Sequence, residues 1–310
     1  MVNGRKYWRT IRGWLNSDKI YKKYELMEKI GTGKFSSVYK AKSRISNNFY
    51  AIKIIEKSKL QTDEAELLKN ETAIMKVLNH PFLICLHESF ETLEYYYYIL
   101  ELVDGIDLYQ YITLKGYSEE CQASRILKII LESVKYIHSL GIIHRDLKPE
   151  NIMLHLNDKE KYTWDSIKII DFGFSIYYEE LKNTGSLCGT LDYIAPEILK
   201  GEAYGFPADV FSIGVIFFFL IKGELPFHND THEILIKNIV EKELNFAGDP
   251  FFFNVSDECK DLLGKLLEKN QSKRITIEEA LNHKFIQNPE MFQKFDGRNR
   301  LDSFDINRFI

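Results

Sequence analysis

The sequence predicts an α+β protein, in which a small antiparallel sheet with one main helix precedes a larger and mostly helical part. Short segments rich in aromatic and β-branched residues occupy the first part of the chain. Longer stretches with a helical spacing of apolar residues follow them. At 310 residues, of which 45% are apolar, the chain is long enough for one large domain or for two lobes with substantial cores.

The first strand is expected at Tyr24 to Ile30, and the second begins at Val38. The hairpin tip between them contains Gly31 and Gly33. Two glycines at such a tip let backbone N–H groups approach phosphate oxygens closely. A glycine pair alone more often marks a simple turn, so a phosphate-binding role depends on the segments that follow.

The next strand ends in Tyr-Ala-Ile-Lys, with Lys53 as its last residue. A lysine among apolar neighbours needs a partner for its charge. The candidate is Glu71, eighteen residues later, in a helix expected from Ala65 to Leu78. The alternative, two unrelated surface charges, is disfavoured because apolar residues flank both positions.

Asn-His-Pro at 79–81 ends that helix, and two further strands are expected at Leu83–Phe90 and Tyr95–Leu100. The latter contains four consecutive tyrosines, Tyr95 to Tyr98, which packing within a sheet explains better than stacking on nucleic acid. In the helical part, Ala123 to Leu140 is amphipathic and precedes Gly141, a candidate helix cap.

The longest apolar run, Val210 to Ile221, is too short to span a bilayer and is expected to form a helix buried on all sides. The hydrophilic stretch Leu156 to Ser166 resembles a long hairpin, but a solvated loop without function is the preferred interpretation. A net charge of −4 gives no drive towards nucleic acid or an anionic membrane. Four cysteines without a Cys-x-x-Cys pair indicate reduced thiols and a cytoplasmic location, and the N-terminus lacks the apolar core of a signal peptide.

The strongest chemical signal is the stretch His-Arg-Asp-Leu-Lys-Pro-Glu-Asn at 144–151, followed by Asp-Phe-Gly at 171–173. These segments place two carboxylates, a lysine and an amide on two adjacent loops. The set suits phosphoryl transfer from a metal-bound nucleotide, whose transition state spreads negative charge over phosphoryl oxygens. Asp and Asn can supply the oxygen ligands that Mg²⁺ prefers. A polar loop followed by an ordinary turn is disfavoured, because the glycine pair and Lys53 precede it at usable spacing.

Together these motifs resemble those of eukaryotic protein kinases, over about nine-tenths of the chain. The resemblance implies a two-lobed fold, with ATP and Mg²⁺ as cofactors. It implies that Asp146 is the catalytic base, that Lys148 contacts the γ-phosphate, and that Asn151 and Asp171 bind Mg²⁺. Lys148 favours Ser/Thr over tyrosine specificity.

The resemblance also implies a nucleotide pocket. Lys53 is expected to pair with Glu71 and to contact the α- and β-phosphates, as part of the catalytic set. The segment from Glu101 to Gly105 is expected to be the hinge between the lobes, with Leu100 as gatekeeper. Kinases usually carry a third glycine where this chain has Ser36. The residues expected to line the nucleotide are Ile30, Gly31, Gly33, Val38, Ala51, Lys53, Glu71, Leu100, Glu101, Val103, Asp107 and Met153.

The implied organisation is a basic extension at 1–23, a kinase domain at 24–286 and a tail at 287–310. Within the domain, the N-lobe covers 24–103 and the C-lobe 104–286. The extension either forms a basic amphipathic helix or belongs to a linker. The tail, which includes Phe292, either docks on the large lobe or is a linker.

The activation segment is expected from Asp171 to Glu197, with Ser186 as a regulatory phosphorylation site for an upstream kinase and Thr184 as second candidate. Arg145 could pair with that phosphate bidentately. Glu197 is expected to form a buried ion pair with Arg274. Asp209 is expected to cap the backbone of the catalytic loop.

For substrates, Asp107 and Glu150 are expected to accept an arginine upstream of the phosphorylated residue. Relatives that select two adjacent arginines have an acid where this chain has Phe219. An apolar pocket for the residue after the acceptor is expected from Leu187, Leu191 and Ile194.

We therefore expect an active MgATP-dependent protein Ser/Thr kinase that resembles the calcium/calmodulin-dependent group, including calcium-dependent and protein kinase D-like branches. The alternative is a pseudokinase scaffold, disfavoured by intact Lys53, Asp146, Asn151 and Asp171. A small-molecule kinase is disfavoured by Ala-Pro-Glu at 195–197. The chain contains no EF-hand loop, and its tail is a poor calmodulin target.

Overall fold

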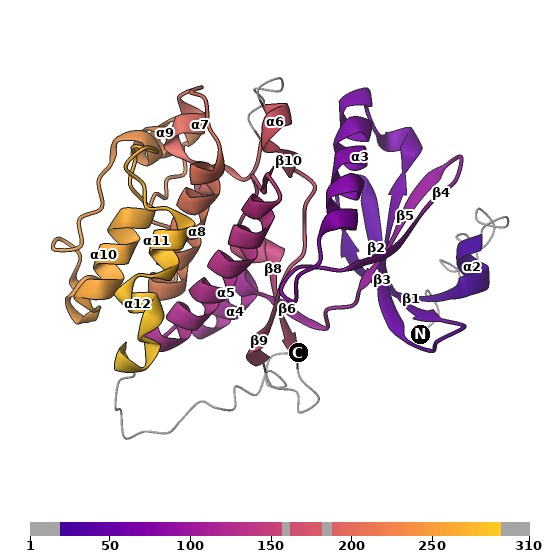
Figure 1. The fold of residues 1–310 in the computed structure, drawn as a ribbon, viewed down its shortest axis with the longest axis horizontal. Coiled ribbons are helices and arrows are strands. Elements are labelled where there is room, and N and C mark those ends of the chain that lie inside the picture. Colours follow the sequence, from indigo (N-terminus) through magenta and orange to yellow (C-terminus); the bar gives the residue numbers. More distant parts are fainter. Residues whose placement is uncertain (1–18, 157–161, 182–187, 293–310) are drawn as a thin grey trace. The chain divides into compact units, whose positions relative to one another are not determined.

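The computed structural model describes residues 19–156, 162–181 and 188–292. The chain divides into two compact units, which are coloured along the sequence in Figure 1. The first unit comprises 1–66 and 85–102, and the second comprises 67–84 and 103–310. Residues 67–84, which the sequence assigned to the smaller lobe, therefore group with the larger part.

The first unit is built on a five-stranded antiparallel sheet in the order β1-β2-β3-β5-β4, preceded by the short helix α2 (Lys19–Lys23). Its elements are β1 (Tyr24–Thr32), β2 (Ser36–Ser43), β3 (Phe49–Glu56), the 3-10 turn η1 (Lys57–Lys59), β4 (Leu86–Glu91) and β5 (Tyr95–Glu101). The expected strands are present. The fourth begins at Leu86 rather than Leu83, because Leu83 instead bridges to Ile169 in the second unit.

One face of this sheet carries the core of the first unit. Successive side chains of a strand point to opposite faces, so alternate residues share one side. The buried cluster contains one residue of α2 and five from β1, β2, β3 and β5, namely Ile20, Tyr24, Ala41, Ile52, Tyr97 and Ile99. Tyr97 of the tyrosine run therefore belongs to this core and Tyr95 packs against it, as the sequence indicates.

The second unit is mostly helical. Its first helix, α3 (Thr62–Val77), begins before the boundary between the units at residue 66. The other helices are α4 (Leu108–Lys115), α5 (Glu120–Ser139), α6 (Tyr178–Leu181), α7 (Pro196–Leu199), α8 (Phe206–Lys222), α9 (His232–Glu241), α10 (Asp257–Leu266), α11 (Ile277–Leu281) and α12 (Lys284–Gln287). The described part of this unit also contains the 3-10 turns η2 (Pro149–Asn151), η3 (Leu191–Tyr193), η4 (Pro250–Asn254) and η5 (Pro289–Phe292).

Two small sheets position the loops of this unit. One has the order β6-β8-β9, with β6 (Gly105–Asp107), β8 (Ile152–Leu156) and β9 (Tyr162–Ile169), and the other pairs β7 (Ile142–Ile143) with β10 (Ile176–Tyr177). Of the two alternatives for 156–166, the structure supports the hairpin for part of the stretch, and the preferred solvated loop is wrong there. From Tyr162 onwards this stretch belongs to β9, because its backbone pairs with β8 in an antiparallel hairpin.

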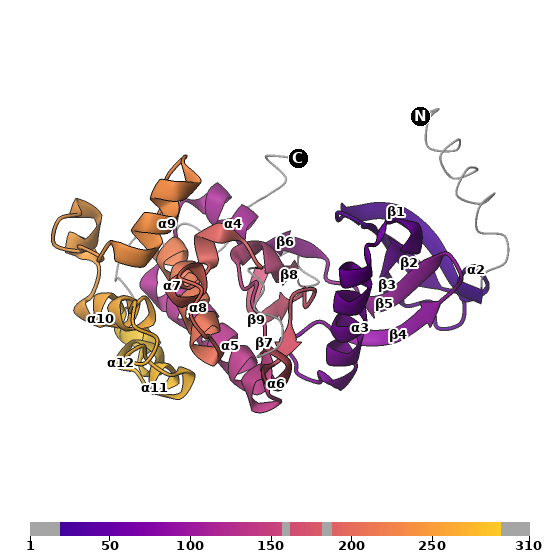
Figure 2. The ribbon, with the colours of Figure 1, turned by 90° about the horizontal axis from the view of Figure 1, so that it is seen from above.

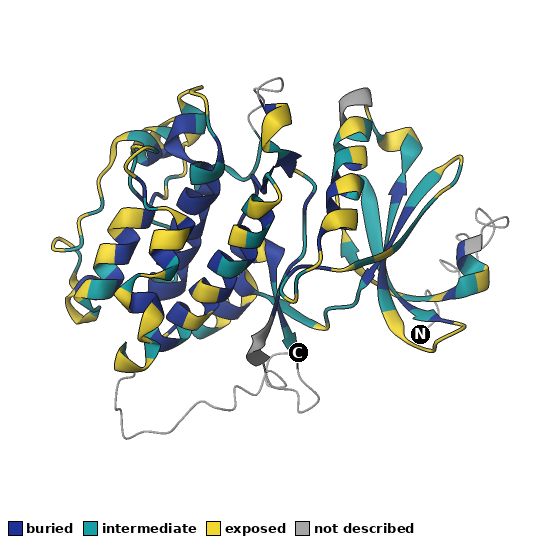
Figure 3. Ribbon diagram, in the orientation of Figure 1, coloured by how far each residue is buried: buried dark blue, intermediate teal, exposed yellow. Residues whose placement is uncertain are grey.

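Helix α8 is buried on all sides, as its uniformly apolar sequence predicts. Every residue from Ala208 to Ile221 is buried, and Figure 3 shows the helix in dark blue among helices with exposed outer faces. Helix α5 runs beside it in both views (Figures 1 and 2) and ends at Ser139. Gly141, two residues later, has a φ of +72° and its N–H donates to the His138 carbonyl, which agrees with the predicted capping glycine. In the described part of the chain, no helix has the length and apolar character needed to cross a membrane.

The first residues after α12 pack on the helical unit. Glu290 receives a hydrogen bond from Arg125 of α5 at 2.5 Å, and the Phe292 ring lies 4.9 Å from Phe285. This agrees with docking for the start of the tail. The remainder of the tail and the N-terminal extension lie outside the described residues.

A buried ion pair joins α7 to the loop before α11. Arg274 binds both carboxylate oxygens of Glu197, at 2.7 and 2.8 Å, and neither side chain is exposed by more than 1%. Its other N–H groups donate to backbone carbonyls, including that of Pro207 at 2.7 Å. The predicted pair is therefore confirmed, and it fixes the end of the activation segment.

We predict that Arg274→Met lowers the free energy of unfolding by about 3–5 kcal/mol, because it leaves the Glu197 carboxylate buried without its partner. Lys265→Met is the matched control, since Lys265 makes an exposed ion pair with Asp261 worth about 0.3–0.5 kcal/mol. Urea unfolding followed by circular dichroism measures both. Equal effects of the two substitutions would contradict this reading of the buried pair.

Candidate active site

Residues 144–148, which include Asp146, form the loop between β7 and η2 and are called the catalytic loop below. A carboxylate of α8 holds this loop. Asp209 accepts the backbone N–H of His144 at Oδ2 and that of Arg145 at Oδ1, both at 2.9 Å. This confirms the predicted cap. Arg145 has a φ of +68°, a left-handed conformation that is uncommon for residues other than glycine and that these two hydrogen bonds help to hold.

Asp209 has a further partner that sequence reasoning missed. His138, in the last turn of α5, lies with its Nε2 2.8 Å from Asp209 Oδ2. Burial alone would raise the pKa of Asp209. The hydrogen bond and charge of His138, together with the hydrogen bond from the His144 N–H, outweigh burial, so the pKa of Asp209 is lowered. The only local signal was a histidine closing an amphipathic helix, which does not reveal its partner.

The side chain of Asp146 is fixed by donors to both carboxylate oxygens. Oδ1 accepts the backbone N–H and the hydroxyl of Thr190, each at 3.0 Å. Oδ2 lies 2.9 Å from Lys148 Nζ and 3.1 Å from Asn151 Nδ2. Lys148 also donates to the Thr190 hydroxyl at 2.8 Å. A carboxylate oriented in this way is suited to accepting a hydrogen bond from a substrate hydroxyl.

Asn151 and Asp171 lie on adjoining backbone segments. The Ile170 N–H donates to the Asn151 carbonyl at 3.0 Å, and Asp171 Oδ1 accepts the Gly173 N–H at 3.0 Å. Asn151 Nδ2 donates to the backbone and side chain of Asp146, which orients the amide and leaves its Oδ1 as the atom able to ligate a cation. One carboxylate and one amide oxygen fit Mg²⁺ bound together with nucleotide phosphates.

The His144 ring connects the two loops. The ring packs against that of Phe172, with ring centroids 5.1 Å apart. The backbone carbonyl of His144 accepts a hydrogen bond from the Ser175 hydroxyl at 3.3 Å. Burial lowers the pKa of His144 and keeps the imidazole neutral. The Asp-Phe-Gly segment is therefore packed against the loop that carries Asp146.

The activation segment passes close to the catalytic loop at Gly189. This residue has a φ of +97°, and a Cβ there would lie 2.7 Å from the Arg145 carbonyl oxygen, so only glycine fits. The Arg145 side chain donates to the Phe174 carbonyl at 2.6 Å and to the Tyr204 hydroxyl at 3.4 Å. The regulatory candidates Thr184 and Ser186, and the pocket residue Leu187, lie outside the described residues.

Of the two acids assigned to substrate recognition, Asp107 is half-buried and Glu150 is exposed. Asp107 caps α4, because its Oδ1 accepts the Gln110 N–H at 2.7 Å, so only part of its carboxylate can face a substrate. Burial raises the pKa of Asp107 and of Glu150, and the charges of Asp107 and Asp146 add to the effect at Glu150. No sequence pattern indicated the capping role. Leu191 is the first residue of η3, and Ile194, which follows its last residue, is buried.

The expected nucleotide-binding residues divide between the two units. The first unit carries Ile30, Gly31, Gly33, Val38, Ala51, Lys53, Leu100 and Glu101, and the second carries Glu71, Val103, Asp107 and Met153. At the hairpin tip, the Gly33 N–H donates to the Ser36 carbonyl at 2.9 Å. The pairing of Lys53 with Glu71 and the binding of adenine at the hinge stay predictions.

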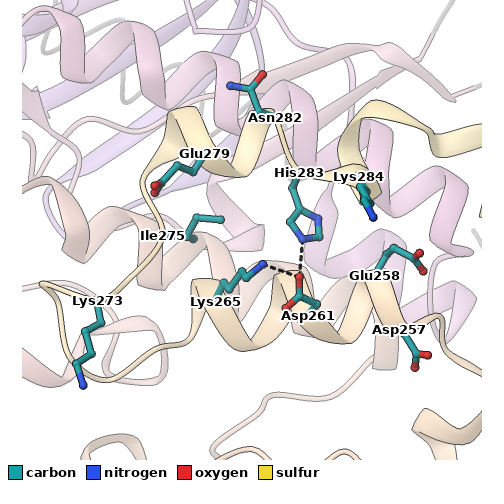
Figure 4. A pocket seen from close by; sticks show the side chains of 10 residues that line it. All are labelled: Asp257, Glu258, Asp261, Lys265, Lys273, Ile275, Glu279, Asn282, His283 and Lys284. Atoms are coloured by element: carbon teal, nitrogen blue, oxygen red, sulfur yellow. Dashed lines mark hydrogen bonds and ion pairs between the residues drawn. The ribbon is translucent and has the colours of Figure 1, made fainter.

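A separate pocket of about 710 Å³ lies among α10, α11 and α12 (Figure 4). Its charged groups pair with one another, since Asp261 bonds Lys265 at 2.6 Å and His283 at 2.8 Å. None of the residues that line it belongs to the sets described above. The candidate active site is therefore the Asp146 loop and not this pocket.

Comparison with known proteins agrees with this geometry. The family model described as "Protein kinase domain" matches residues 24–286. Myosin light chain kinase A of Dictyostelium discoideum is 37% identical over 94% of this chain and 95% of its own length. Calcium-dependent protein kinase 5 of Plasmodium falciparum is 37% identical over 96% of this chain, and the match covers 50% of that protein's length.

Human calcium/calmodulin-dependent protein kinase type 1B is 35% identical over 90% of this chain and 79% of its own length. The match to the family model and these relatives confirm the resemblance that the sequence motifs indicate. The chain belongs to the protein kinase family, as a serine/threonine protein kinase of the calcium/calmodulin-dependent group.

Proposed function

We propose that this chain transfers the γ-phosphate of MgATP to serine or threonine hydroxyls of protein substrates inside the cell. The observation that carries the proposal is the Asp146 carboxylate, held by Lys148, Asn151 and Thr190 from three points of the chain. The four cysteines are free thiols, which supports an intracellular location.

In the proposed reaction, Asp146 orients the substrate hydroxyl and accepts its hydrogen bond as the hydroxyl attacks phosphorus. Lys148, 2.9 Å from that carboxylate, offsets negative charge on the transferred phosphoryl group. Asn151 and Asp171 would hold Mg²⁺, which neutralises charge on the phosphates when it is bound. The protein's share of catalysis is thus positioning and electrostatic stabilisation.

The competing proposal is a pseudokinase that binds partners without chemistry. A scaffold would have no need to keep Asp146, Lys148 and Thr190 in one hydrogen-bonded set. The intact set therefore supports an active enzyme, and phosphate transfer from radiolabelled ATP to a basic peptide separates the two proposals.

Lys53→Met and Asp171→Asn should each lower kcat by at least about 10²–10³, because each removes a preorganised charge near phosphate or metal. Both variants should keep the wild-type unfolding midpoint, since neither residue belongs to the core. Steady-state phosphorylation and thermal unfolding measure the two effects. Near-normal turnover in either variant would remove these residues from the proposed site.

Thr190→Val should lower kcat by about tenfold or more, because the Asp146 and Lys148 side chains lose the hydroxyl between them. A hydrogen bond to a charged group contributes about 1.5–3 kcal/mol. Thr190→Ser keeps that hydroxyl and is the matched control, with near wild-type kcat. If the serine variant is as slow as the valine variant, the hydroxyl does not have the proposed role.

For substrates, we propose a preference for one basic residue three positions before the acceptor, with Glu150 as its main partner. Replacing that arginine by alanine in a peptide should lower kcat/KM by about tenfold, or roughly 1.4 kcal/mol. Because partial desolvation raises the pKa of Glu150, its carboxylate gains a proton at a higher pH than a fully solvated glutamate does. The preference should therefore weaken as the pH falls. An unchanged preference in Glu150→Ala would refute the assignment.

Phosphorylation of Ser186 by an upstream kinase is proposed to raise activity modestly, with Arg145 as the phosphate's partner and Thr184 as the second candidate. The Arg145 guanidinium already bonds Phe174 and Tyr204, which supports basal activity without a phosphate. Ser186→Ala should lower the rate of the activated enzyme but leave the basal rate. Equal rates for fully activated wild type and Ser186→Ala, compared by initial-rate assay, would contradict this role.

A further inference from the structure

The four tyrosines of β5 divide between the two faces of the sheet in the first unit. Tyr97 belongs to the core that contains Ile20, and Tyr95 packs at its edge. Because side chains alternate along a strand, Tyr96 and Tyr98 point to the opposite face. The core that contains Ile20 therefore accounts for only half of the run.

Each of the other two tyrosines lies against a lysine. The Nζ atom of Lys57 is 4.5 Å from the centroid of the Tyr96 ring, and that of Lys53 is 6.0 Å from the centroid of Tyr98. Both distances lie within the range in which an aromatic ring attracts a cation. The second lysine is the one assigned to the phosphates of ATP.

The position of Tyr98 is fixed by the sheet. It pairs directly with Lys53 on β3 and with Ser89 on β4, so it sits on a strand with neighbours on both sides. Its side chain is only 1% exposed, whereas Lys53 is half-buried. Residues that face each other across a strand pair have Cβ atoms about 4.5–5.5 Å apart, so the ring is a fixed wall beside the flexible lysine.

We propose that Tyr98 is a positioning residue, whose buried ring directs the Lys53 ammonium towards the nucleotide phosphates. The inference rests on the proposed function for the role of Lys53. An aromatic ring attracts the ammonium through the face of the ring, and this contact uses none of the ammonium's N–H groups. The ammonium is thereby oriented while its capacity to hydrogen-bond carboxylate or phosphate oxygens is kept.

Tyr96 provides a control on the same face of the same strand. Its lysine, Lys57, lies beyond the end of β3 and also forms an ion pair with Glu91 at 2.6 Å. Lys57 is not among the residues assigned to nucleotide binding. Removing the Tyr96 ring tests the general effect of losing an aromatic residue from this face.

The test compares Tyr98→Leu, Tyr98→Phe and Tyr96→Leu in the full chain. Lys53 is acetylated with an N-hydroxysuccinimide ester in the absence of nucleotide, and its modification rate is followed by peptide mass spectrometry. Without the ring, the amine is less covered and its charged form less favoured, so Tyr98→Leu should react about three- to tenfold faster. Tyr98→Phe, which keeps the ring, and Tyr96→Leu should react at the wild-type rate.

The same variants are then assayed for phosphorylation. Tyr98→Leu should raise KM for ATP by about three- to tenfold with a smaller change in kcat, and Tyr98→Phe should restore both. If Tyr98→Leu does not fold, Tyr98→Met takes its place, because methionine adapts to irregular core space.

An unchanged acetylation rate in Tyr98→Leu or Tyr98→Met would overturn the proposal. So would equal effects of the phenylalanine and leucine variants, since the hydroxyl rather than the ring would then be responsible. A faster acetylation of Lys53 with an unchanged KM for ATP would uphold the ring contact. That result would instead contradict the proposed role of Lys53 in binding ATP.

Discussion

The buried carboxylate of Asp209 is the constraint on which the catalytic loop depends. It accepts two successive backbone N–H groups, of His144 and Arg145, which would otherwise be buried without partners. These bonds also hold Arg145 in a left-handed conformation that costs of order 1–3 kcal/mol for a residue with a side chain. The apolar helix α8 gives the carboxylate a rigid base, because that helix is buried on every side.

The activation segment is tied to this base at two places. Near its middle, Gly189 and Thr190 meet the catalytic loop, where the missing Cβ of glycine lets the chains approach and the threonine binds Asp146. At its end, Glu197 is anchored by Arg274. Before Gly189, the described part of the segment is also held, since the Tyr178 N–H donates to the Gly141 carbonyl at 2.8 Å and Leu181 packs with Ile143 and Ile176. The proposed regulatory serine lies outside the described residues.

The first unit shows how one strand can serve packing and chemistry together. Alternation along β5 sends Tyr97 into the core and Tyr98 towards Lys53, so the same four-residue run stabilises the sheet and faces the lysine that is proposed to bind ATP. A strand is well suited to this, because its register with β3 sets which tyrosine faces which residue. A slip of one position would place Tyr97 or Ile99 opposite the lysine.

The sequence by itself determined the α+β class, most of the strands, the buried helix α8 and the Glu197–Arg274 pair. Strand and helix periodicity are local properties, and the ion pair was implied by the resemblance to protein kinases. Only the tertiary structure decided the contacts of His138 with Asp209, 71 residues apart, and of Thr190 with Asp146, 44 residues apart. It likewise decided that Asp107 caps α4 and that Tyr98 faces Lys53. Such contacts depend on how distant segments pack, and a single sequence carries no periodic signal of that packing.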